Sequence, residues 1–281
     1  HADGTANADD FIASVAEGSG IADIEAAFKS FIDQPGVPLV RVGVVCEDGE
    51  KPRLDVSQSR YAPLGSSINT TASQWLIPMC VSYDSDGTRK SSCAMLRESQ
   101  QTITLESESC PSQLHPNADG AGYYRFAMEN SWLDALVAGS SSLSASEALV
   151  LVDSLDASFL AGEACADSFV TGMATLIDHP DWDVAEAAMD HMEDAIHILH
   201  AEEMELVYPG LQNMVKTRYE QLADAEDEAS KLLRKRMQRF LIVVARDQAL
   251  RRPLAEQAAA RIGLNGAADP SAIPVDQTET A

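Results

Sequence analysis

The stretch FIDQPGVPLVRVGVV at residues 31–45 contains the change from helical to strand patterning that decides the fold. Its run QPGVP at 34–38 places two prolines and a glycine together, and such a run ends a helix because proline lacks the amide donor. Directly after it, residues 39–45 place three valines at alternate positions, which is typical of one face of a strand. The sequence therefore predicts an α segment up to residue 36 and a β segment from residue 37.

Working backwards, residues 8–33 carry apolar side chains at helical spacing and predict two short helices, broken near Gly18 and Gly20. Two short helices do not make a domain alone. Working forwards, residues 38–128 read as strands separated by turn signals such as Asp86-Gly87, with no helical period between them. The expected strands cover 39–45, 53–60, 74–83, 91–96, 101–105 and 122–128. Residues 37–130 are thus predicted to form an antiparallel β-sandwich.

After residue 131 the pattern becomes helical, and Ser144 with Glu147 has the spacing of a capping box. Apolar stripes then run along 184–204 and 232–244. We expect residues 131–263 to form an α-helical, HEAT-like repeat domain and residues 264–281 to be a disordered tail. The predicted fold class is multidomain β + α, with a β-sandwich followed by an all-α domain and preceded by two short helices.

Several motifs in this order resemble one protein family. The matching motifs are FIDQPGVPLV (31–40), SQSRY (57–61), WLIP (75–78), GYYRF (122–126), the segment 143–153 and LLR (232–234). Their order and spacing resemble those of the C-terminal part of aminopeptidase N (alanyl aminopeptidase) zinc metallopeptidases. The resemblance covers most of the chain. In that family a thermolysin-like zinc domain comes first, then a small β-sandwich, then a helical domain. The resemblance therefore implies that residues 1–36 are the terminal helices of an upstream zinc peptidase domain.

The chemistry of that family lies upstream of the matching region. Its zinc motif H-E-x-x-H places two histidines one helical turn apart with a general base between them, and none of the six histidines here begins that motif. We therefore assign no catalytic, cofactor-binding or metal residue to this chain and expect it to be inactive alone. The resemblance implies zinc in the missing catalytic domain, that domain as partner, and a peptide substrate in the intact enzyme. His1 in place of Met is consistent with a chain cut from a longer protein.

Two constellations compete with this interpretation. AMEN at 127–130 matches four of five letters of the family's substrate-amine motif, and we interpret it as coincidence because it ends a strand that runs into Trp132. A cluster of histidines and glutamates falls on the helix predicted over 184–204 and consists of His191, His197, His200, Glu193, Glu202 and Glu203. A metal site built on His197, His200 and Glu203 is the weaker hypothesis, because no second helix offers matching ligands. We interpret this cluster as a solvated acidic helix face.

Composition excludes some partners. A formal charge of -24, from 44 acidic against 20 basic residues, argues against nucleic acid and against anionic membranes. No stretch approaches the roughly eighteen apolar residues that span a bilayer. Cys80 and Cys93 flank a turn-rich run at 84–87, where a hairpin would bring them together, so a disulfide and two reduced thiols both fit. A disulfide would indicate a periplasmic or secreted protein, and reduced thiols a cytoplasmic one.

The expected function is therefore that of a scaffold. As the non-catalytic C-terminal region of a zinc-dependent aminopeptidase, the chain would shape the active-site cavity and brace the catalytic domain. The alternative is a stand-alone protein-interaction module without peptidase activity. Arg41 and Arg125 lie in predicted strands, and we expect them to form salt bridges within this acidic protein.

Overall fold

The computed structural model of the chain describes residues 5, 7–20, 23–70, 73–264 and 266–273. The chain divides into two compact units, residues 1–172 and residues 173–281. The first unit contains two sheets and helices α1 to α4, and α5 crosses the boundary. The fold is therefore mixed α and β, as the sequence predicts. The domain boundaries expected after residues 36, 130 and 263 stay predictions.

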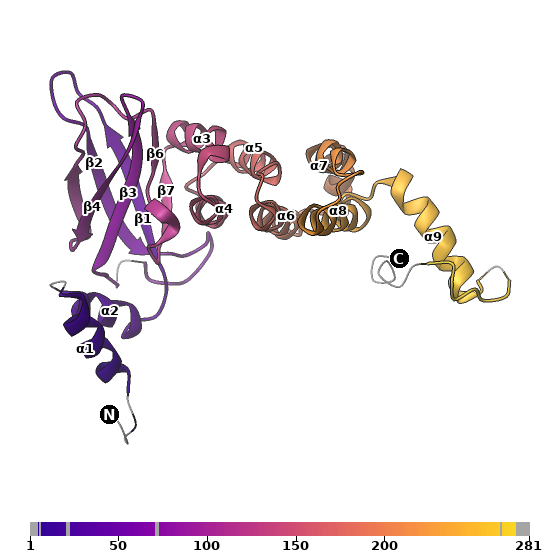
Figure 1. Cartoon of the computed structure of the whole chain (residues 1–281), viewed down its shortest axis with the longest axis horizontal. Helices are drawn as coiled ribbons and strands as arrows, with labels where there is room; N and C mark the ends of the chain where they lie inside the picture. Colours follow the sequence, from indigo (N-terminus) through magenta and orange to yellow (C-terminus); the bar gives the residue numbers. More distant parts are fainter. Residues whose placement is uncertain (1–4, 6, 21–22, 71–72, 265, 274–281) are drawn as a thin grey trace. The chain divides into compact units, whose positions relative to one another are not determined.

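The first unit begins with the two predicted short helices, α1 (Ala8–Ser19) and α2 (Ile24–Ile32). Asn7 caps α1 with its side chain, and Gly20 ends it in the left-handed conformation that glycine adopts at no steric cost. The two helices pack on each other and lie at one end of the strands (Figure 1). Gln34 then fixes the exit from α2, because its side-chain amide donates to the carbonyl oxygens of Ser30 and Gln74.

Two sheets follow in the described part of this unit. The first has the strand order β5-β2-β1-β7 and consists of β1 (Pro38–Val45), β2 (Arg53–Arg60), β5 (Gln100–Thr104) and β7 (Arg125–Met128). The second has the order β4-β3-β6 and consists of β3 (Ile77–Ser85), β4 (Thr88–Leu96) and β6 (Gln113–His115). Six of these strands overlap the predicted ones. The short β6 is not among those predicted.

One pairing differs from the antiparallel expectation. β1 pairs with β7 in parallel, with Val40 opposite Phe126, whereas the other pairings in the described sheets are antiparallel. A parallel pair needs a long crossover, and here the chain from 46 to 124, which holds every intervening strand, supplies it. The side chains follow the period of two, since Val40 and Val42 are buried and Val56 lies opposite Val42.

Helix α4 (Ala145–Leu160) protects the edge of the first sheet. It begins with the predicted capping box of Ser144 and Glu147. Farther along, the Ser154 hydroxyl accepts from the amide of Phe126, and the Ser158 hydroxyl donates to the carbonyl of the same residue. β7 is the edge strand of its sheet, so these bonds satisfy backbone groups that would otherwise be a site for pairing with another chain. The other helical segments here are η1 (Ala118–Gly120), α3 (Asn130–Ala138), η2 (Ser140–Ser142) and α5 (Ala166–Ile177).

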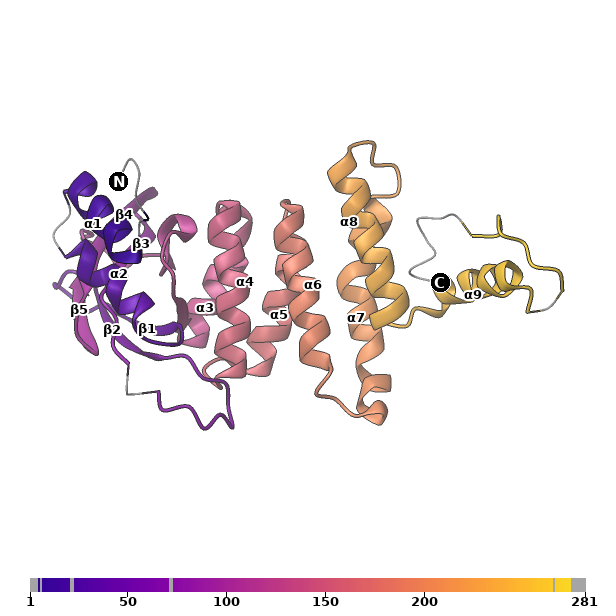
Figure 2. The same ribbon diagram turned by 90° about the horizontal axis from the view of Figure 1, so that it is seen from below.

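The second unit is helical over its described residues. It contains α6 (Trp182–Ile196), α7 (Ala201–Gln221), α8 (Glu228–Arg239), the π-helical turn η3 (Phe240–Val244) and α9 (Gln248–Ile262), and α8 packs against α6 and α7 (Figure 2). The single helix predicted over 184–204 is wrong. It breaks after Ile196, and His200 adopts an extended conformation in which the Glu203 carboxylate accepts its backbone amide at 2.7 Å.

The segment predicted to be a disordered tail is only partly described. Residues 265 and 274–281 lie outside the described residues. Over 266–273 the chain folds back on α9: the Asp269 amide donates to Ala260, and the Arg261 guanidinium donates to the carbonyls of Pro270 and Ile273. Ile273 is 3% exposed. The prediction of disorder beyond residue 273 is therefore untested.

Candidate interface at the N-terminal helices

An apolar groove runs between α2, the start of β3 and the segment before β7. Its volume is about 550 Å³. It is lined by Ile24, Ala27, Phe28, Phe31, Ile32, Ile77, Pro78, Ala121, Gly122 and Tyr123. No charged side chain is among these residues. The groove is therefore a surface for apolar contact rather than for acid, base or metal chemistry.

The pattern of α2 explains why the groove is apolar. Ile24, Phe28 and Phe31 recur at helical spacing and form one stripe. Within α2 only Ala27 is buried, whereas Ile24, Phe28 and Phe31 are half-buried, so the described residues cover this stripe only in part. The ring of Tyr123 meets Phe31 edge to face at a centroid distance of 6.1 Å, yet 69% of Tyr123 is exposed. Such a contiguous exposed apolar surface usually marks an interaction site.

The charges beside the groove are paired among themselves. Lys29 donates to Glu25 at 2.8 Å and lies 3.6 Å from Asp9, which joins α2 to α1. In α1, Phe11 is 61% exposed while Ile12 is buried. The two helices thus hold a fixed hairpin that presents apolar side chains outward. The sequence predicts these helical positions but not the contact with Tyr123, which lies 92 residues from Phe31.

A buried polar cluster at the N-terminus of α4 contains a serine, a histidine and a glutamate, the residue types of a hydrolase triad. The Ser82 hydroxyl donates to the Glu147 carboxylate at 2.8 Å, and Arg89 donates to the Ser82 hydroxyl at 2.7 Å. His115 bonds the backbone carbonyl of Glu147 through Nε2 at 3.0 Å instead of bonding Ser82. A nucleophile needs its proton accepted by the base, and this arrangement does not provide that. The cluster anchors α4 to the second sheet.

Burial and hydrogen bonds set the protonation of this cluster. The pKa of His115 lies below its ordinary value, chiefly because the ring is fully buried. Its Nδ1 accepts from the Asn117 amide at 3.1 Å, so the single proton of the neutral ring belongs on Nε2. Burial alone would raise the pKa of Glu147, but the hydrogen bond from Ser82 and the other donors around it lower that pKa. The sequence gives no signal for this cluster.

The remaining sequence candidates take structural positions. Ala127 and Met128 end β7 and Glu129 precedes α3, beside a shallow polar depression of about 290 Å³ that Arg41 also lines. Arg41 is held there by Glu163 at 2.6 Å, so the salt bridge predicted for it is confirmed. Arg125 likewise pairs with Asp153.

The histidines proposed as metal ligands are separated by the break between α6 and α7. His197 follows the last residue of α6, and His200 precedes the first residue of α7. Glu203 accepts the amide of His200 as a helix cap. Among the described residues there is no group of three or more His, Cys, Asp or Glu side chains arranged to hold a metal ion.

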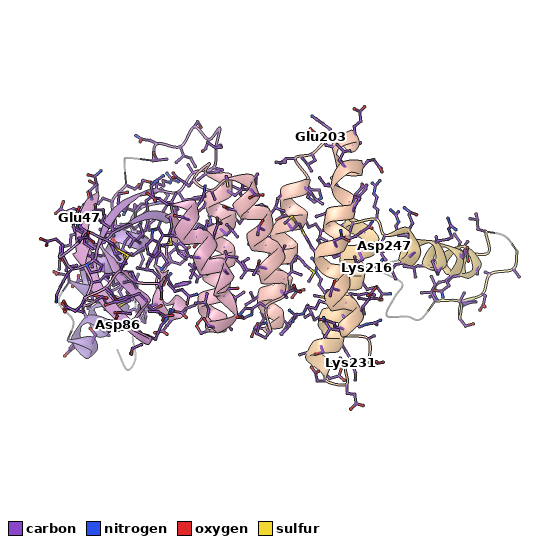
Figure 3. The ribbon with its side chains drawn as sticks, turned by 90° about the horizontal axis from the view of Figure 1, so that it is seen from above. Glu47, Asp86, Glu203, Lys216, Lys231 and Asp247 are labelled. Carbon is purple, nitrogen blue, oxygen red and sulfur yellow. A yellow bond between two sulfur atoms is a disulfide. The ribbon has the colours of Figure 1, made fainter. Side chains whose placement is uncertain are left out.

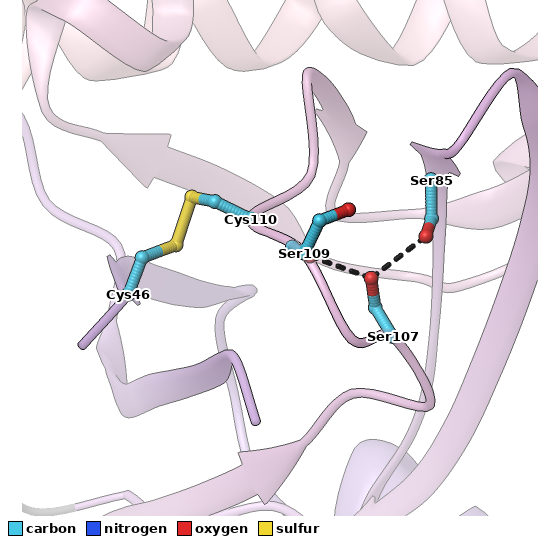
Figure 4. Close-up of a disulfide and its surroundings, with 5 residues drawn as sticks. All are labelled: Cys46, Ser85, Ser107, Ser109 and Cys110. Carbon is cyan, nitrogen blue, oxygen red and sulfur yellow. Dashed lines mark hydrogen bonds between the residues drawn. A yellow bond between two sulfur atoms is a disulfide. The ribbon is translucent and has the colours of Figure 1, made fainter. Parts of the chain in front are cut away.

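Two disulfides join the strands of the first unit. Cys80 and Cys93 stand opposite each other in β3 and β4 and are bridged, with a Cα–Cα distance of 4.1 Å. Cys46 and Cys110, which are 64 residues apart, form the second bridge, and the sequence does not predict it. Near it the Ser107 hydroxyl bonds the Ser109 carbonyl and the Ser85 hydroxyl (Figure 4). Cys165 is free and exposed.

No protein-family model matches the chain, and a search of curated proteins likewise finds no match. Among the described residues no helix is long and apolar enough to cross a membrane.

Proposed function

We propose that this chain is the non-catalytic C-terminal region of a larger zinc-dependent aminopeptidase that removes N-terminal residues from peptides. In this proposal the zinc and the reacting water belong to a preceding catalytic domain. The chain braces that domain and forms part of the wall of the active-site cavity. It turns over no substrate alone.

The groove beside α2 is the observation that carries the proposal. Its apolar lining includes Ile32 and Tyr123, which are 57% and 69% exposed. Burial of one such side chain against a partner contributes roughly 1.5–3 kcal/mol, so leaving several of them in water favours a covering domain. The groove adjoins the QPGVP run at 34–38, where the resemblance places the end of the zinc domain. A covering catalytic domain would thus bury the surface that the described residues leave open.

The order of elements is a second support. A helical hairpin, two sheets and then consecutive helices follow one another along the chain, as the resemblance implies. We propose that the two sheets form a β-sandwich. The Cys46–Cys110 bridge ties the end of β1 to the loop before β6, and the Ser85–Ser107 bond ties β3 to the same loop. We further propose that the helices after residue 131 form a HEAT-like repeat.

The two disulfides support an oxidising compartment. We propose a periplasmic or secreted parent protein on this basis. Both bridges would persist in such a compartment, because it lacks the reducing system that would open them.

Aminopeptidase activity tests the proposal directly. Alanyl and leucyl chromogenic substrates are given to this chain and to the longer gene product, with added zinc and with a chelator control. The expected result is chelator-sensitive turnover by the longer protein alone. Chelator-sensitive turnover by this chain would contradict the proposal.

Groove variants of the longer protein test the bracing role. Tyr123→Asp and Ile32→Asp place a charge where the catalytic domain would pack, so we expect at least a tenfold loss of kcat/KM or a lower Tm of the catalytic domain. Leu206→Asp is the matched control, because Leu206 is 82% exposed on α7 and is not among the residues that line this groove. Activity and Tm equal to those of the unchanged protein in all three variants would show that the groove does not contact the catalytic domain.

The alternative is a stand-alone protein-interaction module, and the same groove is the feature that favours it. In that case the longer product shows no aminopeptidase activity, whereas Tyr123→Asp abolishes binding of a separate protein. The activity assay therefore separates the two functions.

A further inference from the structure

A second cavity lies within the helical unit and is unrelated to the N-terminal groove. It has a volume of about 260 Å³ and opens where α6 ends, α7 begins and η3 passes. It is lined by Glu193, Ile196, His197, Leu199, Met204, Tyr208, Val243, Val244 and Arg246. The volume is slightly below that of pockets that hold drug-sized molecules, so a ligand would be small.

The cavity has a mixed lining, in which apolar side chains lie beside the polar groups of Glu193, His197 and Arg246. Ile196 and Val244 are buried, while Val243 is 47% exposed at the rim. Leu199 and Met204 line the cavity from the two sides of the break between α6 and α7. An alkyl chain would therefore meet apolar side chains from several elements.

Arg246 is the cation of the cavity. Its guanidinium lies 5.2 Å from the centroid of the Tyr208 ring, and within the described residues no carboxylate pairs with it. The one carboxylate that lines the cavity, Glu193, is already engaged by Arg236 at 3.3 Å and Arg239 at 3.9 Å. The cavity therefore offers the guanidinium of the exposed Arg246, with which no carboxylate of the described residues pairs, beside apolar side chains.

The backbone holds Arg246 in place. Its φ of 50° is in the left-handed region, which is unfavourable for arginine. The residue before it, Ala245, accepts from the Gln212 amide at 2.9 Å, and the residue after it, Asp247, is buried and caps α9. Lys216 and Asp247 lie side by side at 3.3 Å (Figure 3). Strained residues fixed in this way, and π-helical turns such as η3, concentrate at functional sites.

We propose that this cavity binds a small monocarboxylic acid with a short apolar chain. The carboxylate pairs with the Arg246 guanidinium, and the chain packs on Leu199, Met204 and Val243. A guanidinium favours carboxylates because its donors match the two oxygens. The Tyr208 ring behind the guanidinium supports it by a cation–π contact. This site is independent of the proposed aminopeptidase relationship.

Calorimetric titration of the full chain with octanoate tests the site. We expect saturable binding with one site per chain. Hexanoate, which lacks two methylenes, should bind roughly tenfold more weakly because less apolar surface is buried. Octan-1-ol and octylammonium keep the chain but not the carboxylate, so we expect at least a tenfold loss for each.

Variants assign the binding to Arg246. Arg246→Gln should weaken octanoate by about tenfold or more, whereas Arg252→Gln, which changes an arginine of α9 outside the cavity, should leave the Kd unchanged. Arg246→Gly serves as a second variant, because glycine adopts the φ of 50° without strain and so preserves the fold. Far-UV circular dichroism and Tm verify folding of each variant.

Three results would overturn the proposal. One is no saturable octanoate binding by the folded chain. Another is equal affinity for octanoate and octan-1-ol, which would indicate apolar adsorption alone. The third is an unchanged Kd in the folded Arg246→Gln and Arg246→Gly variants, which would place the acid elsewhere.

Discussion

Arg125 and Asp153 form a two-point ion pair between β7 and α4. The guanidinium Nε lies 3.0 Å from one carboxylate oxygen, and Nη2 lies 3.1 Å from the other. The same guanidinium lies 4.4 Å from the centroid of the Tyr61 ring. One side chain therefore joins an edge strand, the helix that covers its edge and the segment after β2.

Arg125→Lys should destabilise the chain by about 1 kcal/mol. Lysine keeps the charge but loses the second hydrogen bond and stacks less well on Tyr61. The loss is small because the Asp153 side chain is 46% exposed and solvent screens the pair. Urea unfolding measures the change.

Arg97→Lys is the matched control for that variant. Arg97 pairs with Asp23 through a single contact, and both side chains are close to half exposed. We expect a change within about 0.5 kcal/mol. If both lysine variants lose equal stability, the two-point geometry of Arg125 contributes nothing.

The buried His115 makes stability depend on pH. Its pKa in the folded chain lies below the ordinary value of about 6.5, so the unfolded chain binds more protons between those two pKa values. Stability is therefore full above about pH 6.5 and falls as the pH decreases toward the folded pKa of His115. A proton added at Nδ1 would also face the Asn117 amide, which already donates there. Urea unfolding between about pH 8 and pH 5 measures this loss.

His115→Gln isolates the contribution of this ring. The variant is less stable overall, since a fully buried side chain with two hydrogen bonds is changed. Its stability should nevertheless fall less steeply with decreasing pH than that of the parent chain. Glu147 acts in a lower window: its pKa is lowered, so its contribution is lost as the pH falls from about 4.3 through its folded pKa. Identical pH slopes in the two chains would show that His115 titrates normally.

The two disulfides should differ in their effect on stability. Replacing Cys46 and Cys110 by serine frees a loop with a sequence separation of 64, whereas replacing Cys80 and Cys93 frees one with a separation of 13. Loop-closure entropy predicts losses of about 4 and about 3 kcal/mol respectively. Guanidinium unfolding of the two double variants measures the difference.

Cys165→Ser is the control for the disulfide variants. Cys165 is exposed and forms no disulfide, so this change should leave the free energy of unfolding within about 0.5 kcal/mol of that of the parent chain. A larger loss from the Cys80 and Cys93 pair would contradict the entropic ranking. It would indicate that packing between β3 and β4 depends on that bridge.

Local chemistry explains which elements can be predicted from the sequence. Gly20 ends α1 and Ser144 with Glu147 begins α4, and both signals act within one helical turn. The short β6 has three residues between Pro111 and Pro116, too few to show an alternation of apolar and polar side chains. The break between α6 and α7 is not visible in the sequence because the apolar spacing continues through Ile198 and Leu199.

Contacts between distant residues explain what the sequence does not show. Pairing of Cys46 with Cys110 depends on where β1 ends relative to a loop 64 residues later, and no local pattern encodes that. The apolar stripe of α2 can be read from Phe28 and Phe31, but that it stays only partly covered and meets Tyr123 follows only from the fold. The left-handed Arg246 is likewise set by its tertiary partners.

Gly36→Ala tests whether the QPGVP junction requires glycine. Gly36 has a φ of 107°, and an added Cβ would lie 2.4 Å from Arg60 Nε, so backbone strain and a side-chain clash act together. We expect a loss of about 2 kcal/mol in urea unfolding. Gly43→Ala is the matched control, because its added Cβ would have an ordinary contact of 3.6 Å with the Asp55 carbonyl oxygen. Its stability should change by less than about 1 kcal/mol. A loss in Gly36→Ala as small as that expected for Gly43→Ala would mean that the junction tolerates a side chain, and glycine would then not be what sets the path from α2 into β1.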